Sequence, residues 1–133
     1  MVSKKKSSQG SEHPGSIGNL TLELRRGALV LAVLSQLRVE QYGYSLIQRL
    51  TARGLEINEG TLYPLLRRLE AQGLLTSDWQ VVEGKRPRRY YRLSGVGEDA
   101  LRNLGEEWEQ LSGVMARLLA SSTGSDTPGG KDR

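Results

Sequence analysis

The strongest concentration of charge in the sequence lies at positions 85–92, KRPRRYYR, where five of eight residues are cationic and none is acidic. Guanidinium groups present a planar fork of donors that matches phosphate oxygens. Cations that neutralise a nucleic-acid backbone also release its condensed counterions, which favours binding. The segment therefore predicts a contact with DNA phosphates, made by Lys85, Arg86, Arg88 and Arg89. The alternative is a solvated turn that is basic without having a partner.

Residues 58–72 supply a second candidate site. Leucines at positions 62, 65, 66 and 69 follow the i, i+3, i+4, i+7 spacing of a helix with one buried face, and Asn58 is a good N-cap. The opposite face begins with small residues, which would let a helix approach the major groove closely, and it carries arginines that could reach bases or phosphates. The alternative is an ordinary polar helix surface. The candidate DNA-contacting residues are Asn58, Gly60, Thr61, Tyr63, Pro64, Arg67 and Arg68. Pro64 also predicts an irregular first turn.

Tyr42 and Tyr44 flank Gly43 at the start of another predicted helix. In a helix-turn-helix this end crosses the sugar-phosphate backbone, and a tyrosine hydroxyl can donate to a phosphate. The alternative is that one or both rings close the core. We expect Tyr42 to be partly exposed and Tyr44 to contact DNA.

Nothing in the sequence predicts catalysis. Cysteine is absent, and the one histidine, His13, lies in a polar N-terminal stretch. No nucleophile lies beside a base, no metal-ligand spacing occurs, and no glycine-rich phosphate loop follows a strand. We therefore expect a protein that is not an enzyme and that uses no cofactor and no metal.

The elements that must position these residues follow from apolar spacing and turn residues. Three helices are expected at about 21–37, 43–53 and 58–72, the first of them buried on most sides because leucine, alanine and valine cover so much of its surface. Two β-rich segments, 74–82 and 89–93, flank turn residues 83–87 and predict a hairpin with Trp79 packed beneath it. The fold class is mainly α (α+β), a winged helix-turn-helix.

A long last helix is expected from the N-cap Ser94 to about residue 120. Its apolar residues recur at alternating steps of three and four, which is the heptad pattern of a helix that pairs with another helix. This predicts a homodimer with the seam Leu101, Leu104, Trp108, Leu111, Met115 and Leu118. Trp108 is interpreted as an anchor of this interface, and the sharper alternative is that it forms the flat aromatic wall of a ligand pocket between the two subunits.

Length and composition fit one small DNA-binding unit. The chain has 133 residues and a net charge of +4, with a pI near 9.6. Polar stretches at 1–19 and 121–133 are expected to be disordered tails, leaving a winged helix-turn-helix at 20–93 and a dimerisation helix at 94–120. No apolar run approaches the ~18 residues of a membrane span, and Lys4–Lys6 is followed by polar residues rather than by a signal sequence. We expect a cytoplasmic protein.

The segment EGTLYPLLRRLEAQGLL at 59–75, followed by GKRPRRYYRL at 84–93, closely resembles the PadR family of bacterial transcription regulators. The segments RGAL at 26–29 and YGY at 42–44 also match that family, so the resemblance covers about residues 20–120. One departure is an extra residue in the hairpin turn, GKRPR where GRPR is more usual. The single C-terminal helix is similar to that of the multidrug-responsive members.

The resemblance implies a repressor that occupies an inverted-repeat operator as a homodimer. It also implies that flat aromatic ligands can bind between tryptophans at the dimer interface, where Trp108 lies at about the matching place. From the residues alone, two other functions stay open. The chain could coat DNA without sequence preference, as nucleoid proteins do. Alternatively, its basic hairpin could dock on an acidic protein as part of a winged-helix adaptor.

Overall fold

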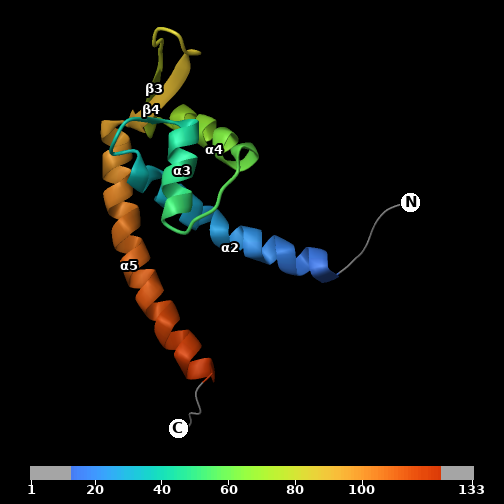
Figure 1. The fold of residues 1–133 in the computed structure, drawn as a ribbon. Coiled ribbons are helices and arrows are strands. Elements are labelled where there is room, and N and C mark those ends of the chain that lie inside the picture. The colour runs from blue at the N-terminus through green and yellow to red at the C-terminus, as the bar shows by residue number, and fades with distance from the viewer. Residues whose placement is uncertain (1–12, 124–133) are drawn as a thin grey trace, which may run out of the picture.

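The computed structural model describes residues 13–123, which form a small helical domain with a projecting hairpin and a long last helix (Figure 1). The elements, in chain order, are α2 (His13–Gln36), β2 (Gln41–Tyr42), α3 (Gly43–Ala52), α4 (Glu59–Ala71), β3 (Leu75–Gln80), β4 (Arg88–Leu93) and α5 (Gly95–Thr123). This order confirms the mainly α winged helix-turn-helix with a long C-terminal helix that the sequence predicts.

Side-chain and backbone caps fix the ends of the helices. The Asn58 side chain accepts a hydrogen bond from the Thr61 amide at 2.9 Å, which starts α4. Ser94 does the same for α5, because its hydroxyl accepts from the Gly97 amide at 3.0 Å. Gly54 and Gly73, with φ of 97° and 83°, follow α3 and α4 in the left-handed conformation that ends many helices.

The irregular first turn predicted for α4 is wrong, because the helix is continuous from Glu59 to Ala71 with Pro64 inside it. Proline has no amide hydrogen, so the carbonyl of Gly60, four residues earlier, loses a donor. Gly60 is exposed, and water can supply the missing hydrogen bond there. The helix therefore accommodates Pro64 without a break.

The sheet has three antiparallel strands in the order β2-β4-β3. Strands β3 and β4 pair from Leu75↔Leu93 out to Gln80↔Arg88, which forms the predicted hairpin. The third strand was missed by the sequence, because two residues are too short to show alternation. It pairs Gln41 with Tyr91, and the buried Gln41 side chain donates to the Gln36 carbonyl at 2.5 Å.

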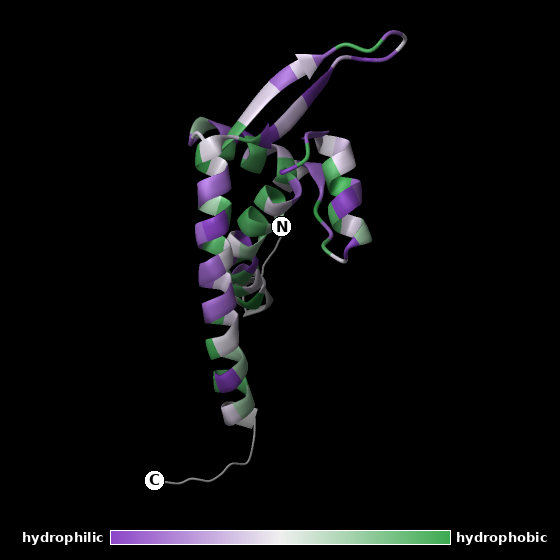
Figure 2. Ribbon diagram, turned by 90° about the vertical axis from the view of Figure 1, so that its left-hand side faces the viewer, coloured by the Kyte–Doolittle hydropathy of each residue, from purple (hydrophilic) through white to green (hydrophobic). Residues whose placement is uncertain are grey.

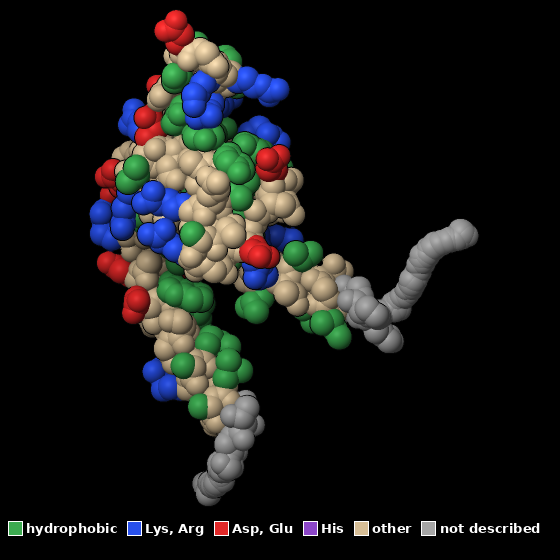
Figure 3. Space-filling view, viewed as in Figure 1, with side chains coloured by type: hydrophobic (Ala, Val, Ile, Leu, Met, Phe, Trp, Pro, Cys, Tyr) green, Lys and Arg blue, Asp and Glu red, His purple; other side chains and the backbone are tan. Residues whose placement is uncertain are grey.

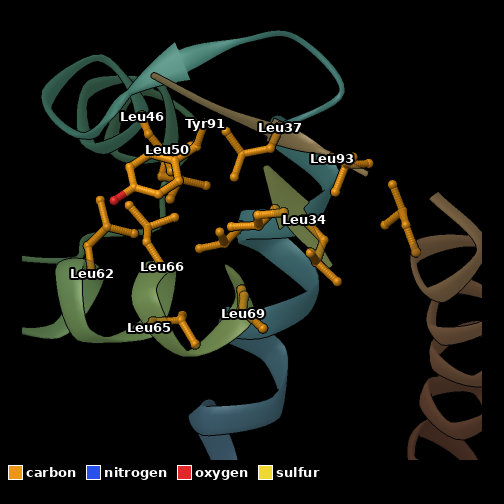
Figure 4. Packing of buried hydrophobic residues seen from close by; sticks show 13 residues of the cluster. Leu34, Leu37, Leu46, Leu50, Leu62, Leu65, Leu66, Leu69, Tyr91 and Leu93 are labelled. Carbon is orange, nitrogen blue, oxygen red and sulfur yellow. The ribbon is translucent and has the colours of Figure 1, made fainter. Parts of the chain in front are cut away.

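The core lies where α2, α3, α4 and the sheet meet. Its residues are almost all leucine, and the ring of Tyr91 lies over Leu62 and Leu66, beside α3 (Figure 4). The buried members are Val33, Leu34, Leu37, Leu46, Leu50, Leu62, Leu65, Leu66, Leu69, Leu75, Tyr91, Leu93 and Leu101. All four leucines of the predicted α4 stripe are buried, which confirms that face of the helix.

Only the C-terminal half of α2 enters this core. Val33 and Leu34 are fully buried, as is Leu37 just after the helix, whereas Leu22 and Leu24 are 60% and 80% exposed. The prediction that this helix is buried on most sides is therefore wrong for the single chain. Figure 1 shows why: the N-terminal half of α2 extends away from the domain, on the side opposite to α5.

The predicted tail boundaries also need correction. Helix α2 begins at His13, so residues 13–19 are helical instead of disordered, and α5 extends to Thr123. Pro14 is compatible with a first helical turn, and Ile17 and Leu20 continue the apolar spacing that leads to Leu24. The remaining parts of the two predicted tails, residues 1–12 and 124–133, lie outside the described residues.

The junction between the sheet and α5 gives a stability prediction. A Cβ at Gly97 would collide with the carbonyl oxygen of Leu74 and crowd Leu93, whereas a Cβ at Gly95 meets nothing within 4 Å. We expect Gly97→Ala to lower the free energy of unfolding by about 1–3 kcal/mol. The matched Gly95→Ala variant should change it by no more than about 1 kcal/mol. Urea denaturation at one protein concentration measures both, and equal effects would contradict this packing.

Candidate nucleic-acid interface

The hairpin, called the wing here (residues 75–93), stands away from the helices, while α5 runs in the opposite direction (Figure 2). Its turn is closed by a hydrogen bond of 2.9 Å from the Lys85 amide to the Val82 carbonyl, and Gly84 takes a φ of 80° that favours glycine. Lys85 and Arg86 are exposed beside this turn. Figure 3 shows blue side chains on the wing, with a red one at its tip.

The outward surface of α4 is built around one arginine. At 100° per residue, Gly60, Pro64, Arg67 and Ala71 fall on the side opposite to the buried leucines. All four are exposed. Since three of them are small or compact, Arg67 is the long side chain on an otherwise low ridge.

The two flanks of this ridge face different neighbours. On one side, Thr61, Pro64 and Arg68 line a hollow of about 280 Å³ shared with Arg26 and Leu29 of α2. On the other side, Tyr63 and Glu70 face the sheet. Of the residues predicted for this helix, Gly60, Thr61, Pro64, Arg67 and Arg68 are exposed on its outward side, whereas Tyr63 packs toward the sheet and Asn58 caps the helix.

The side chain of Asn58 is occupied by the cap that starts α4. Its oxygen already accepts from the Thr61 amide, so the structure gives Asn58 a role in forming the helix. A DNA contact by the same oxygen would have to compete with that bond.

A basic and aromatic cleft of about 530 Å³ separates α4 from the wing. Tyr42 forms one wall: its ring meets Tyr90 edge-on at 5.4 Å between centroids, and the Arg88 guanidinium lies 4.3 Å from its centroid. The full lining is Tyr42, Gly43, Tyr63, Arg67, Trp79, Arg86, Pro87, Arg88, Arg89 and Tyr91. The expected partial exposure of Tyr42 is confirmed, and Tyr44 is 52% exposed.

Tyr63 is held by a close packing contact with the backbone of α3. A Cβ at Gly43 would overlap the Tyr63 ring, so glycine is required for this approach. Burial, followed by the charge of Glu59, raises the pKa of Tyr63 above its ordinary value. Burial likewise raises the pKa of Tyr91, against the opposing charge of Arg89. Both hydroxyls therefore stay neutral at physiological pH.

Arg89 differs from the other cations of the wing because it has an acidic partner. Its Nη2 lies 3.1 Å from Oε1 of Glu70, and its Nε donates to the Ser77 hydroxyl at 2.9 Å. Among the described residues, no ion pair joins Lys85, Arg86 or Arg88 to a carboxylate. The prediction treated all four as equivalent, and the structure separates Arg89 from the rest.

Trp79 corrects a second expectation about the wing. It was expected to pack beneath the hairpin, but its side chain is 62% exposed. Its position toward the outer end of β3, opposite Arg89, places it beyond the reach of the leucine core. The Arg89 guanidinium lies 5.9 Å from its ring, a cation–π contact that partly covers it.

The predicted dimer seam is exposed except at its first position. Leu101 belongs to the core of the single chain, at 6% exposure, because α5 packs on α2 and β4. This corrects its assignment to the seam. The other seam residues are between 40% and 57% exposed: Leu104, Trp108, Leu111, Met115 and Leu118.

Helix α2 carries a second exposed apolar stripe, which the sequence analysis did not predict. Ile17, Leu20 and Leu24 are 65–80% exposed and share a helix face with Ala28 and Leu31. Ala28 and Leu31 line a hollow of about 140 Å³ together with Leu104, Trp108 and Leu111 of α5. Figure 3 shows hydrophobic side chains on α5 and on the lower side of α2, the two limbs of a V. We call this the α2–α5 apolar surface. The i, i+3, i+7 spacing that begins at Ile17 was the signal in the sequence that could have revealed it.

The described part of the chain offers neither a metal site nor a membrane-spanning helix. No group of three or more acidic, histidine or cysteine side chains there could hold a metal ion. No helix between residues 13 and 123 combines the length and apolar character needed to cross a membrane.

Comparison with known proteins gives consistent matches. The model of the transcriptional regulator PadR-like family matches residues 30–103. A transcriptional regulator of Mycobacterium tuberculosis (strain ATCC 25618 / H37Rv) is 42% identical over 106 residues, which cover 79% of this chain and 98% of that protein.

Solved structures agree with these sequence matches. A PadR family transcriptional regulator from Eggerthella lenta DSM 2243 is 46% identical, with a TM-score of 0.70, over 80% of this chain and 94% of that one. A PadR-like transcriptional regulator from Bacillus cereus strain ATCC 14579 is 27% identical, with a TM-score of 0.66, over 73% and 96% of the two chains.

The cap on α4 yields a prediction. Asn58→Ala removes the acceptor for the Thr61 amide and should lower the free energy of unfolding by about 1 kcal/mol. Asn58→Ser keeps a capping oxygen and should retain most of that stability. Urea denaturation of the three proteins measures the difference. Equal stability of the alanine variant and the wild-type protein would show that the cap contributes nothing.

Proposed function

Since this chain belongs to the PadR-like family of transcriptional regulators, we propose that it is a repressor that binds an inverted-repeat DNA operator as a homodimer. The family and the winged-helix fold make it a DNA-binding regulator.

The observation that carries the proposal is the position of Arg67. It stands on the low ridge of α4 and also lines the cleft beside the cationic wing. An arginine on a helix that enters the major groove can donate two hydrogen bonds to guanine, the commonest specific contact. Small neighbours let the helix approach closely enough for this contact. Thr61, Pro64 and Arg68 would lie along the same groove or its edges.

The wing has a different task in this proposal. Lys85 and Arg86 are exposed beside the turn, and Arg88 is held over the Tyr42 ring. These cations would neutralise phosphates next to the groove that α4 enters, which adds affinity but no sequence information. The exposed Tyr44 and the neutral hydroxyl of Tyr63 would donate hydrogen bonds to the same backbone.

The α2–α5 apolar surface supports dimerisation. A single chain leaves Leu24 at 80% and Leu118 at 57% exposure, in stripes that converge on one hollow. Stripes of this kind on a soluble chain mark an interaction site. A second copy would cover both limbs of the V, with residues of α2 joining the seam predicted on α5. The two-fold axis would then require half-sites about one helical turn apart.

The same surface supports a site for a small aromatic effector. Trp108 is 48% exposed and lines the hollow between α2 and α5, with Leu31, Leu104 and Leu111 around it. A flat ring could stack on the indole in the dimer, beside its symmetry mate. Binding there would alter how the two chains sit against each other, and hence the spacing of the two α4 helices that address the operator.

The division between α4 and the wing gives the experiment that tests this function. Selection from a pool of random duplexes by the wild-type protein should return an inverted repeat. Arg67→Ala should relax the preference at one position of each half-site, at a cost of about 1–3 kcal/mol for the correct base. Arg86→Ala should keep the preference and reduce the salt slope by about one for each wing that contacts DNA.

Other outcomes point to the other functions. Recovery of no common sequence, with binding intact, would indicate a protein that coats DNA. An absence of duplex binding at moderate salt would favour an adaptor whose wing docks on an acidic protein.

Dimerisation gives a separate prediction. Leu111→Glu and Leu24→Glu each place a charge on the α2–α5 apolar surface and should yield monomers, because burying an unpaired carboxylate is costly. Val39→Glu makes the same change at a residue that is 55% exposed outside that surface, and should stay dimeric. Sedimentation equilibrium distinguishes the two states. A dimeric Leu24→Glu variant would remove α2 from the interface.

A further inference from the structure

Three side chains from three elements form a closed polar ring between α4 and the wing. Arg89 of β4 donates from Nη2 to Oε1 of Glu70 at 3.1 Å and from Nε to the Ser77 hydroxyl at 2.9 Å. Ser77 of β3 donates in turn to Oε2 of Glu70 at 2.7 Å. Both oxygens of the carboxylate are used, and the hydroxyl donates once and accepts once. We call this ring the Glu70 clamp.

The strand register places the clamp on the inner face of the wing. Ser77 pairs with Tyr91 and Trp79 pairs with Arg89, and paired residues of an antiparallel sheet point to the same side. This inner face changes character along the hairpin. It is leucine at Leu75 and Leu93, then Tyr91 with Ser77 of the clamp opposite it, and then Arg89, so the clamp begins where the leucine core ends.

Aromatic rings hold the arginine in place. The Arg89 guanidinium lies 5.7 Å from the Tyr91 centroid and 5.9 Å from the Trp79 centroid. Its side chain is 40% exposed and that of Glu70 is 28% exposed. An ion pair with this much exposure contributes little to folding stability. We therefore expect this ion pair to affect the position and the charge of the wing more than the stability of the fold.

We propose that Glu70 is a specificity-determining positioning residue, which fixes the wing against α4 and withholds the Arg89 charge from DNA phosphates. The inference rests on the proposed operator binding. A fixed wing ties the phosphate contacts to the one register in which α4 meets its bases. A released Arg89 would add a phosphate contact that is equally available on every sequence. The clamp thus raises the ratio of operator binding to non-specific binding by lowering the latter.

The test compares Glu70→Gln with the wild-type dimer on a selected operator and on a scrambled duplex, by fluorescence anisotropy across a salt series. The amide keeps the size of the side chain and removes its charge. Binding to the scrambled duplex should tighten by roughly fivefold per engaged wing at ~150 mM salt, and the salt slope should steepen by about one per wing. The ratio of operator to scrambled affinity should fall.

Two further variants separate the clamp from a simple change of net charge. Asp99→Asn removes one carboxylate that also pairs with an arginine, Arg102, but on the exposed surface of α5. It should leave the salt slope and the ratio unchanged. Adding Arg89→Ala to Glu70→Gln removes the released cation, and the slope should return to the wild-type value.

Equal effects of Glu70→Gln and Asp99→Asn would overturn the proposal, because net charge alone would then explain the change. An unchanged slope and ratio in Glu70→Gln would overturn it as well. If the wild-type protein itself showed no preference for any sequence, the proposed operator function would fail. The slope on the scrambled duplex would still decide whether Glu70 withholds the Arg89 charge.

Discussion

Burial of the α4 leucines is the constraint on which the rest of the structure depends. Leu62, Leu66 and Leu69 are almost completely buried, and the ring of Tyr91 packs on the same cluster (Figure 4). Because Tyr91 lies on β4, one apolar cluster fixes both the rotation of α4 about its axis and the base of the wing. The side of α4 opposite to these leucines must then face outward, and it carries Arg67 beside the cationic hairpin. The hydrophobic effect thereby aligns the outward side of α4 with the cationic hairpin. The Glu70 clamp adds a direct polar contact between α4 and the hairpin.

The same small core explains why the chain presents so much apolar surface. A leucine cluster centred on α3 and α4 has room for the C-terminal half of α2 and the first turns of α5, where Leu101 is buried. Everything beyond, from Ile17 to Leu24 and from Leu104 to Leu118, diverges as the limbs of a V (Figure 1). The wing and α4 thus lie at one end of the molecule, and the α2–α5 apolar surface extends away from them. Both α2 and α5 join the core, so these two helices connect the α2–α5 apolar surface with α4 and the wing.

Much of this could be predicted from the sequence, because regular spacing records burial directly. The α4 stripe, the hairpin and the heptad pattern on α5 each repeat with the period of their element. Features that depend on partners distant in the sequence could not be read in this way. The two-residue strand at Gln41 exists because β4 offers it an edge, and Arg89 is neutralised by a glutamate that lies on another element. Apolar composition alone assigns Leu22 and Leu24 to the core, because it does not distinguish a surface that the same chain covers from one that it leaves exposed.

The most direct test of operator recognition is fluorescence anisotropy of the full chain on the duplex upstream of its own coding region and on a scrambled duplex, at ~150 mM salt. The account predicts binding to the natural fragment at least ~10³-fold tighter than to the scrambled one, with two chains per site. Equal affinity for the two duplexes would contradict sequence-specific binding at that site. One chain per site would contradict the pairing of two copies that the inverted repeat requires.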